Sequence, residues 1–216
     1  MIKPKALKFG DQLGVVAPAS PTIDEKVKKS YEKLLVMGFK VKMGKSCYEH
    51  YGYLAGSDNL RAEDLNNMFK DDEVHGIICL RGGYGTPRIL DLLDYNAIKN
   101  NPKVFIGYSD ITALHIAINQ LSKLVTFHGP MVSSDIAGNL SEFSKDSLYN
   151  SILEGEFNGN IKNPPEEEIN IINGGIAEGE IIGGNLSLIA DTLGTPYEID
   201  LKGKILLIEE IGEQPY

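Results

Sequence analysis

The feature that most constrains the fold is an alternation of short apolar runs with longer amphipathic stretches across the first 130 residues. The apolar runs lie at residues 13–17, 76–80, 104–106 and 124–127. Runs of this kind are typical of strands buried on both faces of a parallel sheet. Helices must then cross between the strands and cover both faces. The sequence therefore predicts a three-layer α/β/α fold, with its chemistry beyond the carboxyl ends of the strands.

The amphipathic stretches carry apolar residues at the three- and four-residue spacing of a helix. Ser20 and Pro21 predict the start of the first helix, as a cap and a first-turn proline. Its buried face is predicted to comprise Ile23, Val27, Tyr31, Leu34 and Leu35. Residues 39–43 alternate apolar side chains with lysines, which suits an edge strand. Further helices are predicted after Asp58, after Thr86 and over residues 111–121.

The composition changes after a helix predicted around residues 145–153, where glycine, proline and acidic residues become frequent. Only about fifty residues follow this linker, with strand signals near residues 179–182 and 204–208 and a helix near 186–193. We predict an N-terminal domain over residues 1–155, a linker over 156–166 and the start of a smaller α/β domain over 167–216. About fifty residues bury only a marginal core. The second domain is therefore expected to be incomplete.

Composition excludes several classes of partner. The chain has 21 basic and 30 acidic residues, a net charge of −9, and no basic stripe, so nucleic acid and anionic membranes are poor partners. No apolar run approaches the roughly 18 residues of a membrane helix, and the apolar run after the N-terminal lysines is too short for a signal peptide. We therefore expect a cytoplasmic protein. Cys47 and Cys79 lack the spacing of metal ligands and exclude a disulfide framework by number; Cys79 is predicted to be a core residue. No metal or cofactor is expected.

The strongest local signal is KVFIGYSDITAL at residues 103–114. Ser109 follows a buried strand and precedes a helix, with Gly107 two residues before it. That turn lifts a hydroxyl above the sheet and points it at free backbone amides of the helix N-terminus, which can stabilise an oxyanion. The alternative is that Ser109 only caps the helix. A complete nucleophile elbow also has a glycine where Ile111 stands.

A second signal is RGGYG at residues 81–85, after the preceding buried strand. Adjacent glycines at 82 and 83 allow backbone N–H groups to approach a ligand closely. The segment is neither a dinucleotide nor a Walker fingerprint. Without further context it is equally compatible with a tight turn.

A serine nucleophile needs a base, and the histidines offer no clear one. His115 lies six residues after Ser109 on the same helix, about 9 Å along its axis and on another face, and cannot reach the hydroxyl. His128 ends the next strand, at the correct edge of the sheet, whereas His50 and His75 stand in surface-like contexts.

Two adjacent carboxylates, Glu209 and Glu210, end the last apolar strand. Either could orient a histidine, although acids at a strand end are more often only solvated. The residues alone thus indicate a serine hydrolase without an identified base.

The sequence resembles the serine LD-carboxypeptidase family, which includes bacterial LD-carboxypeptidases and microcin-immunity peptidases. The matching segments are VAPAS at 16–20, GYLAG at 52–56, RAEDLN at 61–66, RGGYG at 81–85, GYSD at 107–110, FHGPM at 127–131, GGNL at 183–186 and the Glu209 segment. They cover essentially the whole chain in the same order.

The resemblance implies an amidotransferase-like α/β/α domain followed by a smaller C-terminal domain, with a Ser–His–Glu triad between them. Ser109 matches the nucleophile and Glu209 the triad acid, with Glu210 the alternative if the register shifts by one. The amides of Gly83 and Asp110 match the oxyanion donors, and Gly82 and Arg81 belong to the same binding loop. The family suggests a homodimer and no cofactor.

In the family the triad histidine follows the glutamate segment, and none of the four histidines here occupies that position. We therefore expect either that the intact protein continues past Tyr216 or that this chain is a fragment lacking its base. Without the histidine, turnover is expected to fall by several orders of magnitude.

The activity implied is removal of the terminal D-amino acid, across an LD bond, from murein tetrapeptides during peptidoglycan recycling. A close alternative is a microcin-immunity-like peptidase that cleaves an aminoacyl-nucleotide amide. An alternative of another class is a catalytically inactive binding module.

Overall fold

Five parallel strands form the central sheet, in the order β2-β1-β3-β4-β5. The computed structural model describes residues 1–138, 140–153 and 159–212. The strands are β1 (Gln12–Val16), β2 (Lys40–Met43), β3 (Gly76–Cys79), β4 (Val104–Gly107) and β5 (Phe127–His128). In the centre, Ile78 pairs with Val15 on one side and with Ile106 on the other. The predicted parallel sheet is confirmed, with β2 at an edge as expected.

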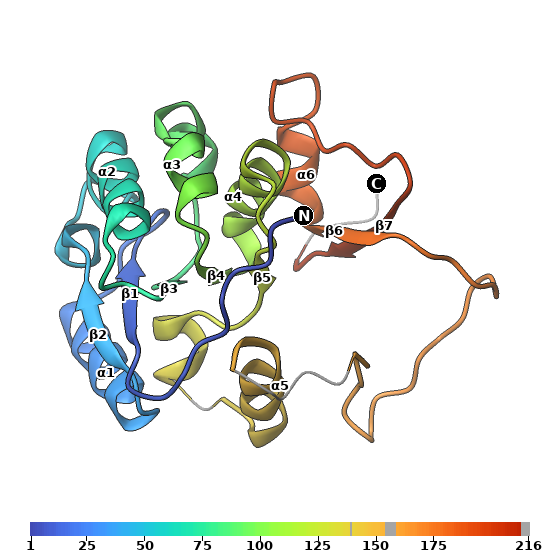
Figure 1. Cartoon of the computed structure of the whole chain (residues 1–216), viewed down its shortest axis with the longest axis horizontal. Coiled ribbons are helices and arrows are strands. Elements are labelled where there is room, and N and C mark those ends of the chain that lie inside the picture. Colours follow the sequence, from blue (N-terminus) through green and yellow to red (C-terminus); the bar gives the residue numbers. More distant parts are fainter. Residues whose placement is uncertain (139, 154–158, 213–216) are drawn as a thin grey trace.

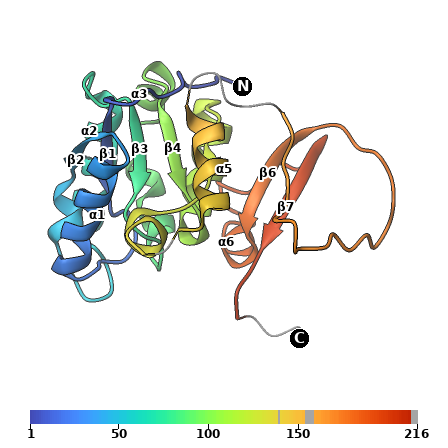
Figure 2. The ribbon, with the colours of Figure 1, turned by 90° about the horizontal axis from the view of Figure 1, so that it is seen from below.

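Helices cover both faces of this sheet (Figures 1 and 2). One face carries α1 (Asp24–Val36), α5 (Glu142–Ile152) and the short helix η5 (Val132–Ile136). The other carries α2 (Asp58–Lys70), η2 (Thr86–Leu92), α3 (Tyr95–Asn100) and α4 (Thr112–Ala117), which continues as η4 (Ile118–Ser122). A further turn, η1 (Lys45–Tyr48), follows β2.

Alternate residues of the central strands point into these two layers. Ile77 and Phe105 join the core under α2 and α4, whereas Ile78 and Ile106 join the core under α1 and α5. Each strand is therefore apolar on both sides, which explains the continuous apolar runs in the sequence. Cys79 is buried in the first of these cores, as predicted.

The start of α1 differs from the prediction. The helix begins at Asp24 with Ile23 at its cap, and Ser20 makes no cap. Its buried stripe is also narrower than predicted. Val27 and Leu34 are buried, but Ile23 is 60% exposed and Leu35 45%. Because α1 lies beside the edge strand β2, only one side of the helix packs against the rest of the fold (Figure 2).

Strand β5 is shorter than the apolar run that predicted it. Leu124 forms an isolated parallel bridge with Ile2, and Val125 donates to the Ile2 carbonyl at 2.9 Å. The first part of this run thus pairs with the N-terminal segment, and only residues 127–128 extend the main sheet.

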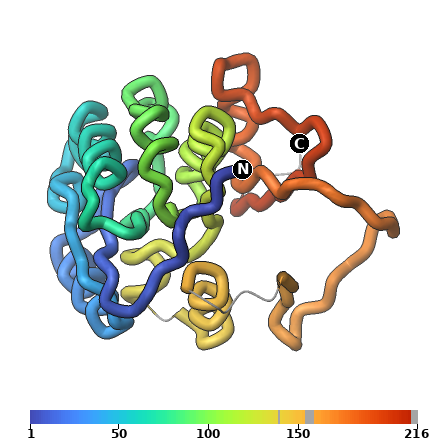
Figure 3. Tube along the Cα trace, in the orientation of Figure 1, coloured from blue at the N-terminus to red at the C-terminus, as the bar shows by residue number. Residues whose placement is uncertain are grey.

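A second, two-stranded parallel sheet pairs β6 (Glu180–Asn185) with β7 (Lys204–Glu209), and α6 (Leu186–Asp191) connects them. A small apolar cluster, comprising Ile116 of α4 with Ile182, Ile189 and Ile199, joins this unit to the main domain. The exposed segment from 159 to 179 loops away from both sheets before it reaches β6 (Figure 3). The predicted boundary at 155/156 lies outside the described residues, so the division into domains stays a prediction.

Candidate active site

The carboxyl ends of β1, β3 and β4 bring three loops together, as parallel strands require. They contain Ser20, residues 81–85 and Ser109 respectively. The second sheet reaches the same place, because Thr112 Oγ1 accepts a hydrogen bond from the Asn185 amide at 2.9 Å. The site predicted at this edge is thus built from both sheets.

Ser109 has a left-handed backbone conformation, with φ of 61°. A non-glycine residue in this region carries strain of about 1–3 kcal/mol, and such strain is concentrated at functional turns. Gly107 makes the turn possible, because a Cβ there would lie 2.8 Å from the Ile111 side chain. Ile111 therefore fills the space that Gly107 leaves, which explains how an isoleucine stands where an elbow usually has a second glycine.

The glycine loop approaches Ser109 closely. A Cβ at Gly82 would lie 3.3 Å from Ser109 Cβ and 3.4 Å from its Oγ. Gly83 and Gly85 have φ of 123° and 126°, which side chains rarely permit. Arg81 turns back onto the backbone, and its guanidinium donates to the carbonyls of Gly82 and Pro21.

Asp110 is buried, and its carboxylate accepts the Thr86 amide at 2.9 Å while its carbonyl accepts the Thr86 hydroxyl. Burial raises the pKa of Asp110, and the hydrogen bonds from Thr86 oppose that shift. Within the described part of the chain, the backbone amides of Gly83 and Asp110 donate to no acceptor. Two unengaged amide donors therefore flank the Ser109 turn.

Both ring nitrogens of His115 take part in hydrogen bonds within the fold. Its Nε2 lies 2.8 Å from the Gly107 carbonyl and must donate to it, so Nδ1, 2.8 Å from Thr126 Oγ1, accepts from that hydroxyl in the neutral ring. Burial lowers the pKa of His115 to about 4. With both nitrogens engaged, this imidazole has no lone pair for Ser109.

His128 pairs in register with Gly107 and stands at the correct edge of the sheet. Its ring contacts those of Tyr108 and His115, with centroids 6.0 and 6.3 Å apart. Burial lowers the pKa of His128, and the Glu209 carboxylate acts in the opposite direction. The remaining two histidines lie elsewhere: His50 is exposed, and His75 precedes β3 at the opposite edge of the sheet.

The two neighbouring glutamates have different surroundings. Glu210 accepts hydrogen bonds from the Ser187 hydroxyl and amide, at 2.5 and 2.9 Å, from the Ile211 amide at 2.9 Å and from the Asn185 side chain at 3.0 Å. These donors, the Ser187 hydroxyl foremost, lower the pKa of Glu210 to about 2. Glu209 ends β7 in register with Asn185, and among the described residues its buried Oε1 has no hydrogen-bond partner. A buried carboxylate oxygen of this kind has the capacity to accept an additional donor.

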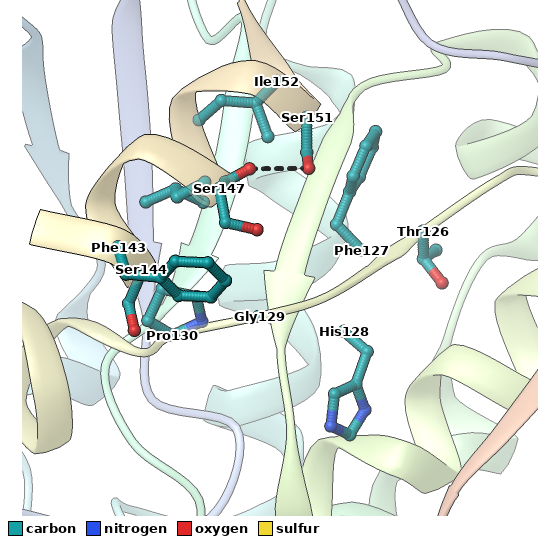
Figure 4. A pocket seen from close by; sticks show the side chains of 11 residues that line it. Thr126, Phe127, His128, Gly129, Pro130, Phe143, Ser144, Ser147, Ser151 and Ile152 are labelled. Carbon is teal, nitrogen blue, oxygen red and sulfur yellow. Dashed lines mark hydrogen bonds between the residues drawn. The ribbon is translucent and has the colours of Figure 1, made fainter. Parts of the chain in front are cut away.

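Figure 4 shows a pocket of about 360 Å³ between β5 and α5. Serines of α5, including Ser147 and Ser151, line it, and the His128 side chain points away from them. No Asp, Glu, Lys or Arg lies among its described lining residues. Likewise, nowhere in residues 1–138, 140–153 and 159–212 do three His, Cys, Asp or Glu side chains gather as metal ligands.

Comparison with known proteins gives these features a family. Residues 13–129 match the model of the LD-carboxypeptidase N-terminal domain, and residues 178–216 that of the LD-carboxypeptidase C-terminal domain. The chain belongs to the LD-carboxypeptidase family. The predicted resemblance is therefore confirmed.

Two curated relatives illustrate the similarity. A probable murein peptide carboxypeptidase of Bacillus subtilis is 49% identical over 215 residues, which are 99% of this chain and 66% of that protein. A putative carboxypeptidase of Streptomyces coelicolor is 34% identical over 227 residues, 100% of this chain and 70% of that protein. The chain thus spans about two thirds of the length of these relatives.

Two solved structures share the LD-carboxypeptidase fold. The microcin C7 self-immunity protein, in an inactive mutant form, has a TM-score of 0.85 at 27% identity, covering 96% of this chain and 70% of its own. The muramoyltetrapeptide carboxypeptidase of Oxalobacter formigenes has a TM-score of 0.79 at 29% identity, covering 95% and 67%.

Residue patterns alone missed one part of this LD-carboxypeptidase site. Ser20, predicted to be a helix cap, instead accepts a hydrogen bond from the Tyr84 amide at 3.1 Å. The signal for a cap and the signal for a loop contact are the same, a serine hydroxyl before a helix. Only the position of the glycine loop distinguishes them.

Proposed function

We propose that this protein is a serine carboxypeptidase that removes the terminal D-amino acid from murein tetrapeptides in peptidoglycan recycling. The observation that carries the proposal is Ser109, held in a left-handed turn beside Gly82, in a chain 49% identical to a probable murein peptide carboxypeptidase. The substrate would be a murein peptide in the cytoplasm. The described part of the chain has no helix long and apolar enough to cross a membrane.

In this proposal Ser109 Oγ attacks the carbonyl of the LD bond as its proton passes to the triad base, which later gives it to the leaving amine. The amides of Gly83 and Asp110 then stabilise the oxyanion, since backbone donors already in place need no reorganisation when charge develops. Collapse of the tetrahedral intermediate expels the D-amino acid as the amine takes up a proton, and water hydrolyses the acyl-enzyme.

Glu209 would orient and stabilise the protonated base. Its buried Oε1, which has no hydrogen-bond partner among the described residues, supports this role, whereas Glu210 already accepts from Asn185 and Ser187. The family resemblance puts the triad histidine after the glutamate, and no histidine follows Glu209 in these 216 residues.

A second candidate is cleavage of an aminoacyl-nucleotide amide. The microcin C7 self-immunity protein supports this second candidate, because its structure matches this chain with a TM-score of 0.85. Both activities would use the same serine and the same donors.

Mass spectrometry distinguishes these candidates. The protein expressed from its complete coding sequence is incubated with murein tetrapeptide and, separately, with an aminoacyl sulfamoyl adenosine. We expect release of D-alanine from the first, and none with Ser109→Ala. Cleavage of the second substrate alone would favour the immunity-like activity, and turnover of neither would overturn the catalytic proposal.

A further inference from the structure

A fully buried arginine lies behind the glycine loop. Arg61 of α2 has no exposed surface. Its Nη1 donates to the Pro18 carbonyl and, at 2.9 Å, to the Gly85 carbonyl, and its Nη2 pairs with Asp58. A buried guanidinium is costly to desolvate unless it is paired and hydrogen-bonded, so this placement requires the partners that it has.

These contacts join three separate segments. Pro18 lies in the loop after β1 and Gly85 ends the loop after β3, while Arg61 and Asp58 belong to α2. Gly85 allows the approach, because a Cβ there would lie 3.0 Å from Arg61 Nη1. The guanidinium therefore fixes the carboxyl end of the glycine loop against two neighbours.

The same loop is fixed to the nucleophile turn from its other side. Thr86, the next residue after Gly85, donates from its amide and its hydroxyl to Asp110. A continuous chain of contacts thus runs from Arg61 through Gly85 and Thr86 to Asp110. Gly83 and Asp110 supply the two amides that the proposed function assigns to the oxyanion.

We propose that Arg61 is a positioning residue that sets the spacing between the Gly83 and Asp110 amides. The inference rests on the proposed function for its catalytic meaning. Arg61 touches no substrate; it acts through the Gly85 carbonyl. An arginine suits this task because its planar fork reaches two carbonyls and a carboxylate at once, whereas a lysine ammonium is a single point of charge.

Arg88 provides a matched control. Its guanidinium donates to the same Asp58 carboxylate, at 2.7 and 3.0 Å, but among the described residues it reaches no loop carbonyl. Only the backbone amide of Arg88 donates to the Gly85 carbonyl, at 3.3 Å, and a side-chain substitution leaves that amide in place. Arg88→Gln therefore removes an ion pair at Asp58 and leaves the glycine loop attached. If only the charge around Asp58 matters, both arginines should behave alike.

The test compares Arg61→Lys, Arg61→Ala and Arg88→Gln with the wild type, in the protein expressed from its complete coding sequence. We expect Arg61→Lys to lower kcat about 100-fold with KM within about threefold, since displacing an oxyanion donor has an effect of this order. Arg88→Gln is expected to keep kcat within about threefold. Guanidinium ion at millimolar concentration, but not sodium chloride, is expected to restore part of the kcat of Arg61→Ala.

A measurement independent of turnover accompanies the kinetics. Amide proton shifts and hydrogen exchange of Gly83 and Asp110 are recorded in wild type and Arg61→Lys, each checked for folding by its melting curve. If Arg61→Lys does not fold, the same measurements are made on Thr86→Val, which removes the hydroxyl contact to Asp110.

The outcomes separate the two proposals. If the wild type is inactive on both substrates, the proposed function is contradicted, and the amide measurements still test whether Arg61 positions the glycine loop. Unchanged Gly83 and Asp110 amides in the folded variant, or an active wild type matched by Arg61→Lys in kcat, would overturn the role of Arg61.

Discussion

The hydroxyl of Ser20 accepts a hydrogen bond from the amide of Tyr84 at 3.1 Å, across 64 residues of sequence. The same hydroxyl occupies the space where a Cβ of Gly83 would project. The loop after β1 thereby supports the glycine loop at the residue next to the proposed oxyanion donor. The Ser20 hydroxyl thus contacts the glycine loop, and α1 begins at its N-cap residue Ile23 without a side-chain cap hydrogen bond.

Replacing Ser20 by alanine should therefore affect turnover more than helix content. Loss of one hydrogen bond of about 1 kcal/mol that supports the donor loop is expected to lower kcat about fivefold to tenfold. Helix α1 should persist in far-ultraviolet circular dichroism, because its cap is Ile23.

Ser57→Ala is the matched control for Ser20. Ser57 does cap α2, accepting the Leu60 amide at 3.3 Å. Its removal should lower the free energy of unfolding by about 0.5–2 kcal/mol and leave kcat unchanged. The reverse pattern between these two variants would contradict the assignment of Ser20.

The left-handed turn at Ser109 predicts that a glycine variant at this position is more stable than an alanine variant. Both Ser109→Ala and Ser109→Gly should lose all turnover. Because φ is 61°, the glycine variant should be more stable than the alanine variant by about 1 kcal/mol in urea denaturation.

Lys123 supplies the control for this backbone effect, since its φ is 56° and it lies away from the site. Lys123→Gly should raise the free energy of unfolding relative to Lys123→Ala by a similar amount, with turnover retained. An alanine variant at Ser109 as stable as the glycine variant would mean that the turn relaxes.

Glu210 predicts a loss of stability in acid. The pKa of Glu210 is about 2 in the folded protein, below its ordinary value of 4.5, through hydrogen bonds from Ser187, Ile211 and Asn185. Its contribution to stability is therefore complete above about pH 5 and is lost as pH falls toward 2. Unfolding measured between pH 2 and 6 should show a weaker pH dependence in Glu210→Gln than in wild type.

Glu209→Gln should differ from Glu210→Gln in turnover. If Glu209 is the triad acid, Glu209→Gln loses turnover whereas Glu210→Gln retains it. Full turnover by Glu209→Gln together with an inactive Glu210→Gln would reverse the assignment of the two residues.

His115 predicts a loss of stability in mild acid. Its pKa is about 4 when folded and 6.5 ordinarily, because burial disfavours the charged ring. The unfolded chain therefore binds a proton that the folded protein does not, and stability falls as pH decreases from about 6.5 to about 4. The full effect is on the order of 3 kcal/mol, and His115→Gln should reduce it.

Titration of the imidazole by nuclear magnetic resonance checks the cause directly. We expect the His115 ring to remain neutral at pH 5.5. A folded protein with His115 protonated at pH 5.5 would contradict the buried neutral ring.

Most of the fold was predictable because it follows from local patterns. The apolar runs around Val15, Ile78 and Ile106 predicted central strands, and these residues pair with one another. The face of α1 was predicted less well, because the spacing of Ile23 and Leu35 shows that they share a side of the helix but not whether a neighbour covers it. Coverage depends on where the edge of the sheet falls.

The candidate site divides in the same way. The strand-to-helix turn at Ser109 and the glycines beside it are visible in the sequence, since a turn restricts residue types locally. The occupation of His115 by Gly107 and Thr126, the saturation of Glu210 and the burial of Arg61 behind the loop are not, because each depends on partners from other segments.

The sequence by itself thus determined a parallel α/β sheet, the strand-to-helix turn at Ser109 on its carboxyl edge and the family. Only the tertiary structure decided which of two adjacent glutamates has a buried oxygen with no partner in the described part of the chain, and that Ser20 and Arg61 support the glycine loop. Hydrophobic periodicity and turn geometry act between near neighbours in the chain, so they leave a mark in the sequence. Hydrogen bonds between distant segments depend on how the folded elements pack against one another. The sequence around a single polar residue therefore does not show whether a partner from another segment will lie beside it.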